Sequence, residues 1–230
     1  MKQEQLALEV HLPEGRMPLN FTPTRFMVGG WAGRDQKAIQ EHIDELAEMG
    51  IAPPKKTPCF YELEPLLLTT ATQIALPRAD SSGEVEVLFF KTGGELYLTV
   101  GSDHTDRKVE AYDITVSKQM CMKPLSQTVW RYCDVADHWD QLIMRSYRTL
   151  NGQRELYQEG SVTTLLHPLE LMEKWKGVPD LEEGEALLCG TQAVIGKLGF
   201  GERFELELFD PILNRTLQHQ YDVALLAVDE

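Results

Sequence analysis

Two glutamates one residue apart, Glu84 and Glu86, are the side chains of this sequence best placed to do chemistry. In an extended chain, side chains two apart project from the same face, so both carboxylates would point one way while the apolar residues between and after them face the opposite layer. Carboxylates this close repel each other, and burial increases the cost. A divalent cation shared with a third carboxylate from residues 101–107 (GSDHTDR) would offset it. Oxygen ligands favour Mg²⁺ or Mn²⁺ over zinc.

The same spacing has a simpler interpretation, because a solvated edge strand can carry two glutamates that merely face water. The residues alone also leave the third ligand open. Asp103 and Asp106 both lie in the downstream segment, and Asp35 could act as a further metal ligand or as a helix cap.

The order of several short motifs narrows these alternatives. The E-x-E pair is followed by Gly101-Ser102-Asp103 with Arg107, by Lys118 ahead of Pro124, by Asn151-Gly152 with Gln158 and Gly160, and by Gly184-Glu185 leading to Gly190-Thr191. This order resembles the fumarylacetoacetate hydrolase superfamily over residues 28–225, most closely a bacterial branch related to its C-terminal catalytic domain. No single motif is specific, and the ordered set carries the resemblance. Ser102 stands where the family usually has asparagine.

The resemblance implies roles for individual residues. It favours Asp103 over Asp106 as the third metal ligand, and it gives Lys118, with Lys123 as a rival, the stabilisation of an oxyanion. The resemblance also implies that Arg107, Gln158 and Thr191 bind the substrate.

A helix predicted over residues 35–49 carries a second constellation, His42-Ile43-Asp44-Glu45. Side chains at i and i+3 share one helix face, so Glu45 can hold His42 in the tautomer that takes a proton from water. The pair resembles the H-x-x-E dyad of the family, which lies on a mobile lid. A histidine flanked by acids on an exposed helix is the plainer alternative.

Together these residues predict metal-assisted chemistry on a small oxo-acid. An oxo-acid can reach a metal through its carboxylate and keto oxygens, while His42 with Glu45 activates water and Lys118 faces the developing charge. The predicted protein is therefore a metal-dependent hydrolase that cleaves a carbon–carbon bond in a small 1,3-dioxo acid such as an acylpyruvate. The alternatives are an oxo-acid decarboxylase or tautomerase at the same site, and a non-catalytic binder of metal and ligand.

The elements that must position these residues are mostly strands. Residues 6–12, 24–29, 83–90, 95–101 and 204–209 alternate or are rich in β-branched residues between Gly and Pro, and helices are predicted over residues 35–49, 135–150 and 168–175. The expected fold is mainly β with a few helices, and the resemblance implies a fumarylacetoacetate-hydrolase-like mixed β-sandwich or β-roll. One domain is expected over 1–230, in which strands and a lid helix in 1–57 lead into a catalytic core in 58–230.

Composition excludes several partner classes. The formal charge of −14 disfavours nucleic acid and anionic membranes, which attract basic surfaces. The four cysteines lack metal-site or disulfide spacing, and the sequence contains neither a signal-peptide core nor a run long enough to cross a bilayer. We therefore expect a cytoplasmic protein, and the resemblance implies a homodimer.

Overall fold

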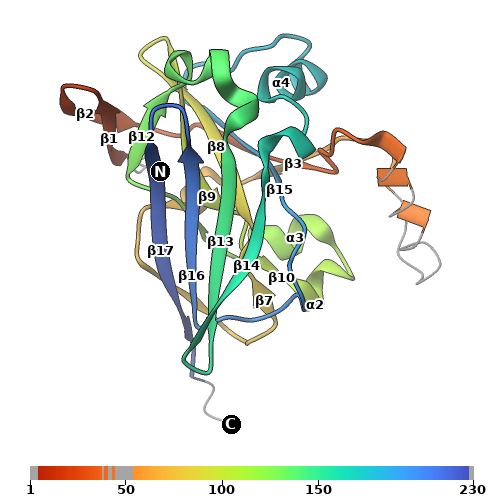
Figure 1. Cartoon of the computed structure of the whole chain (residues 1–230). Coiled ribbons are helices and arrows are strands. Elements are labelled where there is room, and N and C mark those ends of the chain that lie inside the picture. The colour runs from red at the N-terminus through yellow and green to blue at the C-terminus, as the bar shows by residue number, and fades with distance from the viewer. Residues whose placement is uncertain (1–4, 38, 41–42, 45–53, 228–230) are drawn as a thin grey trace.

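The computed structural model describes residues 5–37, 39–40, 43–44 and 54–227 of the 230-residue chain. Two antiparallel or mixed sheets dominate it (Figure 1). The larger sheet has the order β2 (Gly15–Phe21), β1 (Leu6–Leu12), β12 (Thr128–Arg131), β9 (Glu95–Ser102), β8 (Val85–Thr92), β15 (Glu185–Thr191), β3 (Arg25–Gly30) and β4 (Cys59–Leu63). The smaller has the order β14 (Gln153–Ser161), β13 (Ile143–Leu150), β16 (Arg203–Asp210), β17 (Arg215–Leu225) and β6 (Gln73–Leu76).

Short elements complete the described part of the chain. Two-stranded pairs are formed by β7 (Ser81–Ser82) with β10 (Thr105–Asp106), and by β5 (Leu68–Thr69) with β11 (Lys123–Pro124). The α-helices include α2 (Arg107–Glu110), α3 (Ile114–Gln119) and α4 (Pro168–Lys176), and the 3₁₀ turns are Pro65–Leu67, Tyr132–Asp134, Ala136–Gln141 and Val162–Thr164. No helix among the described residues has the length and apolarity needed to cross a bilayer.

Two hydrophobic clusters hold the sheets in place. The first lies between them and contains Val85, Val87 and Phe89 of β8, which pack with residues of the smaller sheet such as Leu206 and Tyr221. The second lies on the opposite face of the larger sheet, and its members come from strands at both ends of the strand order. The larger sheet therefore curls around its own core, as expected for a β-roll, and the mainly β prediction is confirmed.

The register of β8 and β9 places the acidic residues close together. In the β8–β9 pair, Glu86 lies opposite Gly101 and Val85 lies opposite Ser102. Asp103 follows the end of β9, and its backbone N–H donates to the Glu84 carbonyl oxygen at 3.0 Å. Residues almost 20 apart in sequence thus meet at the same end of the sheet.

One predicted element is wrong. Residues 135–150 do not form a helix but a 3₁₀ turn, Ala136–Gln141, followed by strand β13. Along β13 the buried side chains are Met144, Ser146 and Arg148, at intervals of two. This period of two is that of a strand and places the polar residues Ser146 and Arg148 inside. Pairing with β14 and β16 therefore overrides the amphipathic helical pattern. By contrast, all five predicted strands form, and the helix predicted over residues 168–175 is α4, which begins at Pro168 as predicted and ends one residue later, at Lys176.

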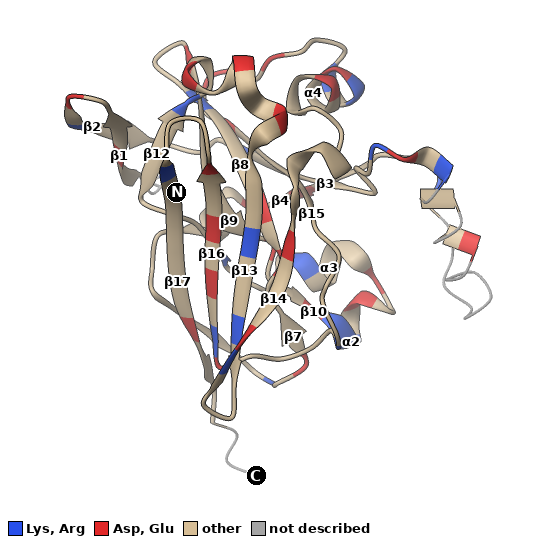
Figure 2. Cartoon of the chain, viewed as in Figure 1, with Lys and Arg blue, Asp and Glu red and all other residues tan. Residues whose placement is uncertain are grey.

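The outer face of the smaller sheet carries charge of both signs, with blue on β13 beside red on β14 and β16 (Figure 2). Arg145 pairs with Glu159 at 2.5 Å and Arg154 pairs with Glu205 at 2.8 Å. The first pair joins the neighbouring strands β13 and β14, and the second spans from β14 across β13 to β16. Partly exposed pairs such as these contribute little stability each. They make the face that points away from the core polar, so that it can face water.

Candidate metal centre

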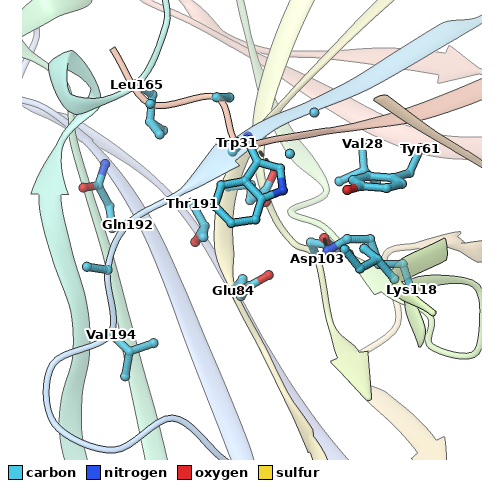
Figure 3. Close-up of a pocket in the computed structure, with 18 of the residues that line it drawn as sticks. Val28, Trp31, Tyr61, Glu84, Asp103, Lys118, Leu165, Thr191, Gln192 and Val194 are labelled. Atoms are coloured by element: carbon cyan, nitrogen blue, oxygen red, sulfur yellow. Dashed lines mark hydrogen bonds and ion pairs between the residues drawn. The ribbon is translucent and has the colours of Figure 1, made fainter. Parts of the chain in front are cut away.

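A cleft of about 680 Å³ opens at the end of strands β8 and β9 where the acidic residues meet. Strand β3 and residues 31–33 form one wall, and residues 190–194, which include the end of β15, form another. Trp31, Thr191, Glu84, Asp103 and Lys118 all point into the same space (Figure 3).

Three carboxylates converge on this cleft. One oxygen each from Glu84, Glu86 and Asp103 lies within 4.8 Å of the other two. Glu86 and Asp103 are buried, at 2% and 0% exposure, and Glu84 is half-buried. A buried set of oxygen ligands with one side open to a cleft suits a hard divalent cation. The predicted triad is therefore brought together, in an arrangement that could hold a metal.

Glu86 is oriented by the strand beside it. The register of β8 and β15 shifts between Leu188 and Thr191, and at this irregularity the backbone N–H of Gly190 donates to Glu86 Oε2 at 2.8 Å. Gly190 has φ 98°, a left-handed conformation that glycine adopts without steric cost. Burial, Asp103 and Glu84 raise the pKa of Glu86 well above its usual value, despite Lys118 and the Gly190 N–H. Without a cation, this carboxyl group is thus in an unfavourable environment for its charge.

Asp103 lies between two buried lysines. Its Oδ2 accepts from Lys118 Nζ at 2.5 Å, and its Oδ1 lies 2.9 Å from Lys123 Nζ. Burial opposes the charge on Asp103, but the two ammonium groups outweigh it and hold the pKa of Asp103 below its usual value. The carboxylate has about four lone-pair positions, so these contacts leave capacity for a cation. Lys118 lines the cleft, whereas Lys123 is 1% exposed and also donates to the His104 carbonyl oxygen.

Arg107 contacts one member of the triad and a neighbouring glutamate. Its Nη2 lies 3.0 Å from Glu84 Oε1, and its Nη1 donates to Glu110 Oε2 at 2.9 Å. Because both contacts are with carboxylates that line the cleft while Arg107 itself does not, the geometry favours a supporting role over direct substrate contact.

A buried polar network lies behind the acidic residues. His104 Nδ1 is 2.9 Å from the Tyr221 hydroxyl, and His104 Nε2 is 2.9 Å from Ser81 Oγ. The Tyr221 hydroxyl also contacts Ser102 Oγ, which accepts from the Glu84 N–H at 3.2 Å. Burial, with Lys123 and Arg107, lowers the pKa of His104 to about 3. The two ring nitrogens of His104 therefore join β7 to β17 behind the acidic residues, and its imidazole stays neutral near neutral pH.

Gln158 lies beneath the cleft and does not line it. Its Oε1 accepts from the Val85 N–H and from Ser146 Oγ, both at 2.9 Å, and its Nε2 donates to Thr191 Oγ1 at 2.8 Å and to the Gln192 carbonyl oxygen at 2.6 Å. These four bonds use the hydrogen-bonding capacity of the amide inside the protein. Thr191 does line the cleft, so the geometry favours Thr191 over Gln158 as a residue that contacts substrate.

Replacing Gln158 with Met should lower the free energy of unfolding by about 1–3 kcal/mol, because the buried Val85 N–H loses its acceptor while the side-chain volume is kept. Urea denaturation measures this change. Gln153→Met, on the exposed start of the same strand, is the matched control and should be neutral. Unchanged stability with a lower affinity for ligand would instead make Gln158 a substrate contact.

The two other aspartates considered as ligands cap helices. Asp106 Oδ1 accepts from the N–H groups of Lys108 and Val109, and its Oδ2 lies 3.1 Å from Arg78 Nη2. Asp35 Oδ1 accepts from the Lys37 N–H at 2.9 Å. Neither belongs to the carboxylate cluster found among the described residues.

The proposed dyad, His42 and Glu45, lies outside the described residues. The segment that leads to it starts at the cleft, because Trp31, Ala32 and Gly33 line the wall. Helical backbone is present at residues 36–37, 39–40 and 43–44. The dyad thus remains a prediction.

Sequence reasoning missed three residues of the cleft. Glu110 adds a carboxylate at the rim, Trp31 contributes an indole in its middle, and Tyr61 contributes a ring 6.0 Å from Lys118 Nζ. Burial and the neighbouring Cys59 raise the pKa of Tyr61 to about 12, so its hydroxyl stays protonated near neutral pH. Gly29-Gly30 before Trp31 was an available signal, since paired glycines allow close approach of the backbone.

Solved structures share this fold. The protein Cg1458 matches with a TM-score of 0.64 and 10% sequence identity, over 97% of this chain and 100% of that one. A 2-keto-3-deoxy-D-arabinonate dehydratase complexed with magnesium and 2,5-dioxopentanoate matches at 0.60 and 17%, over 90% and 74%. A 4-oxalocrotonate decarboxylase from Pseudomonas putida G7, complexed with magnesium and adipate, matches at 0.50 and 12%, over 87% and 77%. Identities this low establish a common fold and no more.

The comparison of sequences gives the family. Residues 29–221 match the family DUF2848, described as "Protein of unknown function (DUF2848)". The chain therefore belongs to this family. Comparison with curated proteins found no match.

Proposed function

We propose that this protein is a divergent member of the fumarylacetoacetate hydrolase superfamily and a Mg²⁺- or Mn²⁺-dependent enzyme that acts on small oxo-acids. The observation that carries the proposal is the convergence of Glu84, Glu86 and Asp103 beside Lys118 in one cleft. The ordered sequence motifs support it. So do the fold neighbours, since two of them are an oxo-acid dehydratase and an oxo-acid decarboxylase with magnesium bound.

In this proposal the three carboxylates hold the cation, which supplies a Lewis acid for the carboxylate and keto oxygens of the substrate. Thr191 lines the wall next to Glu86 and is available to position one of those oxygens. The Lys118 ammonium faces the same space and can stabilise negative charge that develops on a substrate oxygen. Asp103 holds that ammonium in place.

For the reaction itself, we propose hydrolytic cleavage of a carbon–carbon bond in a 1,3-dioxo acid. His42, oriented by Glu45, would take a proton from water as the oxygen attacks the distal carbonyl carbon. The bond between that carbon and the neighbouring CH₂ then breaks, so an acylpyruvate and water yield a carboxylic acid and pyruvate. Lys118 would stabilise the oxyanion formed by the attack.

A lyase reaction is the second candidate, because two fold neighbours are a dehydratase and a decarboxylase. The deciding assay incubates the Mg²⁺-loaded protein with acylpyruvates, with oxaloacetate and with a 2-keto-3-deoxy sugar acid. Hydrolysis predicts pyruvate and a carboxylic acid from acylpyruvates. Carbon dioxide or dehydrated product without acylpyruvate cleavage would assign a lyase, and inertness towards every oxo-acid would favour a non-catalytic binder.

Replacing Lys118 with Met should lower turnover about 10²–10³-fold, the usual cost of removing one oxyanion-stabilising group. Oxalate, which develops no such charge, should bind almost as well as to the wild type, as measured by calorimetric titration. Lys108→Met on the exposed side of α2 is the matched control. Normal turnover in Lys118→Met would remove this lysine from the mechanism.

A further inference from the structure

The cleft has two chemically different ends. The acidic triad and Lys118 form one end, and in Figure 3 Leu165 and Val194 lie on the other side of Trp31 from Asp103 and Lys118. The apolar side chains of this second end are Trp31, Leu165 and Val194, and we call them the distal surface. A ligand that reaches the metal end and fills the cleft must therefore place part of itself against apolar groups.

The polar side chains next to the distal surface are already occupied. Gln192 is 6% exposed, its Nε2 donates to the Ser161 carbonyl oxygen at 3.1 Å, and its Oε1 accepts from Thr164 Oγ1 at 3.0 Å. The Leu165 carbonyl oxygen accepts from Arg34 Nε at 3.1 Å. A polar ligand group placed here would lose water without gaining these partners, which is unfavourable.

The charges of the cleft-lining residues also disfavour a ligand with a second carboxylate. Among the cleft-lining residues that the structure describes, Lys118 is the single cation, set against Glu84, Glu86, Asp103 and Glu110. The neighbouring Arg107 contacts Glu84 and Glu110 and does not line the cleft. A divalent ion would be needed to balance the triad, so no cation among the described cleft-lining residues remains for a second carboxylate of a substrate. Arg34, next to Leu165, is already paired with Asp140 at 3.1 Å.

Trp31 occupies its position at a conformational cost. Its φ is 56°, in the left-handed region that a bulky residue rarely adopts. Such a conformation costs on the order of 1–3 kcal/mol and tends to persist where the side chain has a task. Here it directs the indole into the middle of the cleft, between the metal end and the rest of the distal surface (Figure 3).

We propose that the cleft selects oxo-acids with a single carboxylate and an apolar substituent beyond the keto group, and that the distal surface determines this specificity. The proposal rests on the proposed function, since it assumes that the carboxylate and keto group occupy the metal end. Within that function, it names monocarboxylates with aliphatic or aromatic tails as the substrate class and rejects dicarboxylates.

The test compares two ligands of the same shape. In 5-methyl-2-oxohexanoate, two methyl groups replace the distal carboxylate oxygens of 2-oxoglutarate. Titrated into the Mg²⁺-loaded protein, the branched acid should bind at least about tenfold tighter, given the gain of roughly fourfold per buried methyl or methylene group. Equal or tighter binding of 2-oxoglutarate would overturn the inference. Pyruvate carries only the group assigned to the metal end, so failure of pyruvate to bind would overturn the proposed function itself.

A variant tests whether the distal surface causes the preference for the branched acid over 2-oxoglutarate. Val194 is half-buried and lines this end of the cleft (Figure 3), so Val194→Lys places a cation there while its apolar stem stays on the wall. Val194→Lys should reduce the preference for the branched acid at least about tenfold by attracting the distal carboxylate. Val194→Met, which is long but neutral, controls for the change of shape. Leu213→Lys, at a leucine that is 50% exposed and outside the cleft, is the matched control and should leave the preference unchanged. An unchanged preference in Val194→Lys would contradict the assignment of the distal surface.

Discussion

Replacing Glu86 with Gln should weaken Mg²⁺ or Mn²⁺ binding by about 100-fold or more, because loss of a group that only supports a ligand already costs 10–100-fold. The amide keeps the shape of the side chain and can still accept the hydrogen bond from the Gly190 N–H. It removes the charge that a hard cation requires. Calorimetric titration of the metal-free protein measures the affinity directly.

Two further measurements separate loss of the site from loss of the fold. In the metal-free protein, Glu86→Gln also removes a like charge beside Asp103 and Glu84, so its melting temperature should be equal or higher. Glu95→Gln, at the exposed start of β9, is the matched control and should bind metal normally. Unchanged metal affinity in Glu86→Gln would mean that the cation binds elsewhere.

Replacing His42 with Ala should lower turnover about 10²–10⁴-fold on a verified substrate, the usual contribution of a positioned general base. Metal affinity should stay unchanged, because the carboxylate cluster of the described residues does not require this side chain. The measurement is steady-state kinetics beside a metal titration. His11→Ala on strand β1 is the matched control and should leave both quantities unchanged.

Near-normal turnover of His42→Ala would remove the dyad from the mechanism. It would also favour the lyase reactions, which need no activated water. A loss of turnover confined to hydrolysis, with decarboxylation retained, would show that both outcomes use one metal site.

The predictions from sequence succeeded where a short-range rule fixes the geometry. Alternation along β8 put Val85, Val87 and Phe89 in the core and the glutamates on the opposite face. Asp103 was chosen over Asp106 by the order of motifs, and the structure gives the physical reason, since Asp106 caps α2.

Other features depend on tertiary packing that no local pattern encodes. The β13 segment looks helical in sequence because its apolar residues suit both periods, and pairing with β14 and β16 decides the outcome. The resemblance placed Lys118 ahead of Lys123, but only the fold shows that Lys118 lines the cleft while Lys123 is 1% exposed and does not. Gln158 was assigned to substrate by the family resemblance, whereas the fold uses its amide to join β8 to β14 and Thr191. No sequence pattern predicted a role for Trp31, because that role depends on residues 190–194, which form the other wall of the cleft.

The central claim is that Glu84, Glu86 and Asp103 bind one divalent cation that also receives an oxo-acid. Anomalous X-ray diffraction from crystals grown with Mn²⁺ and oxalate tests it most directly. The account predicts a single strong peak at bonding distance from one oxygen of each carboxylate, with oxalate on the cleft side of the ion. A peak at other residues, or no peak in the cleft when the protein is saturated with Mn²⁺, would contradict it.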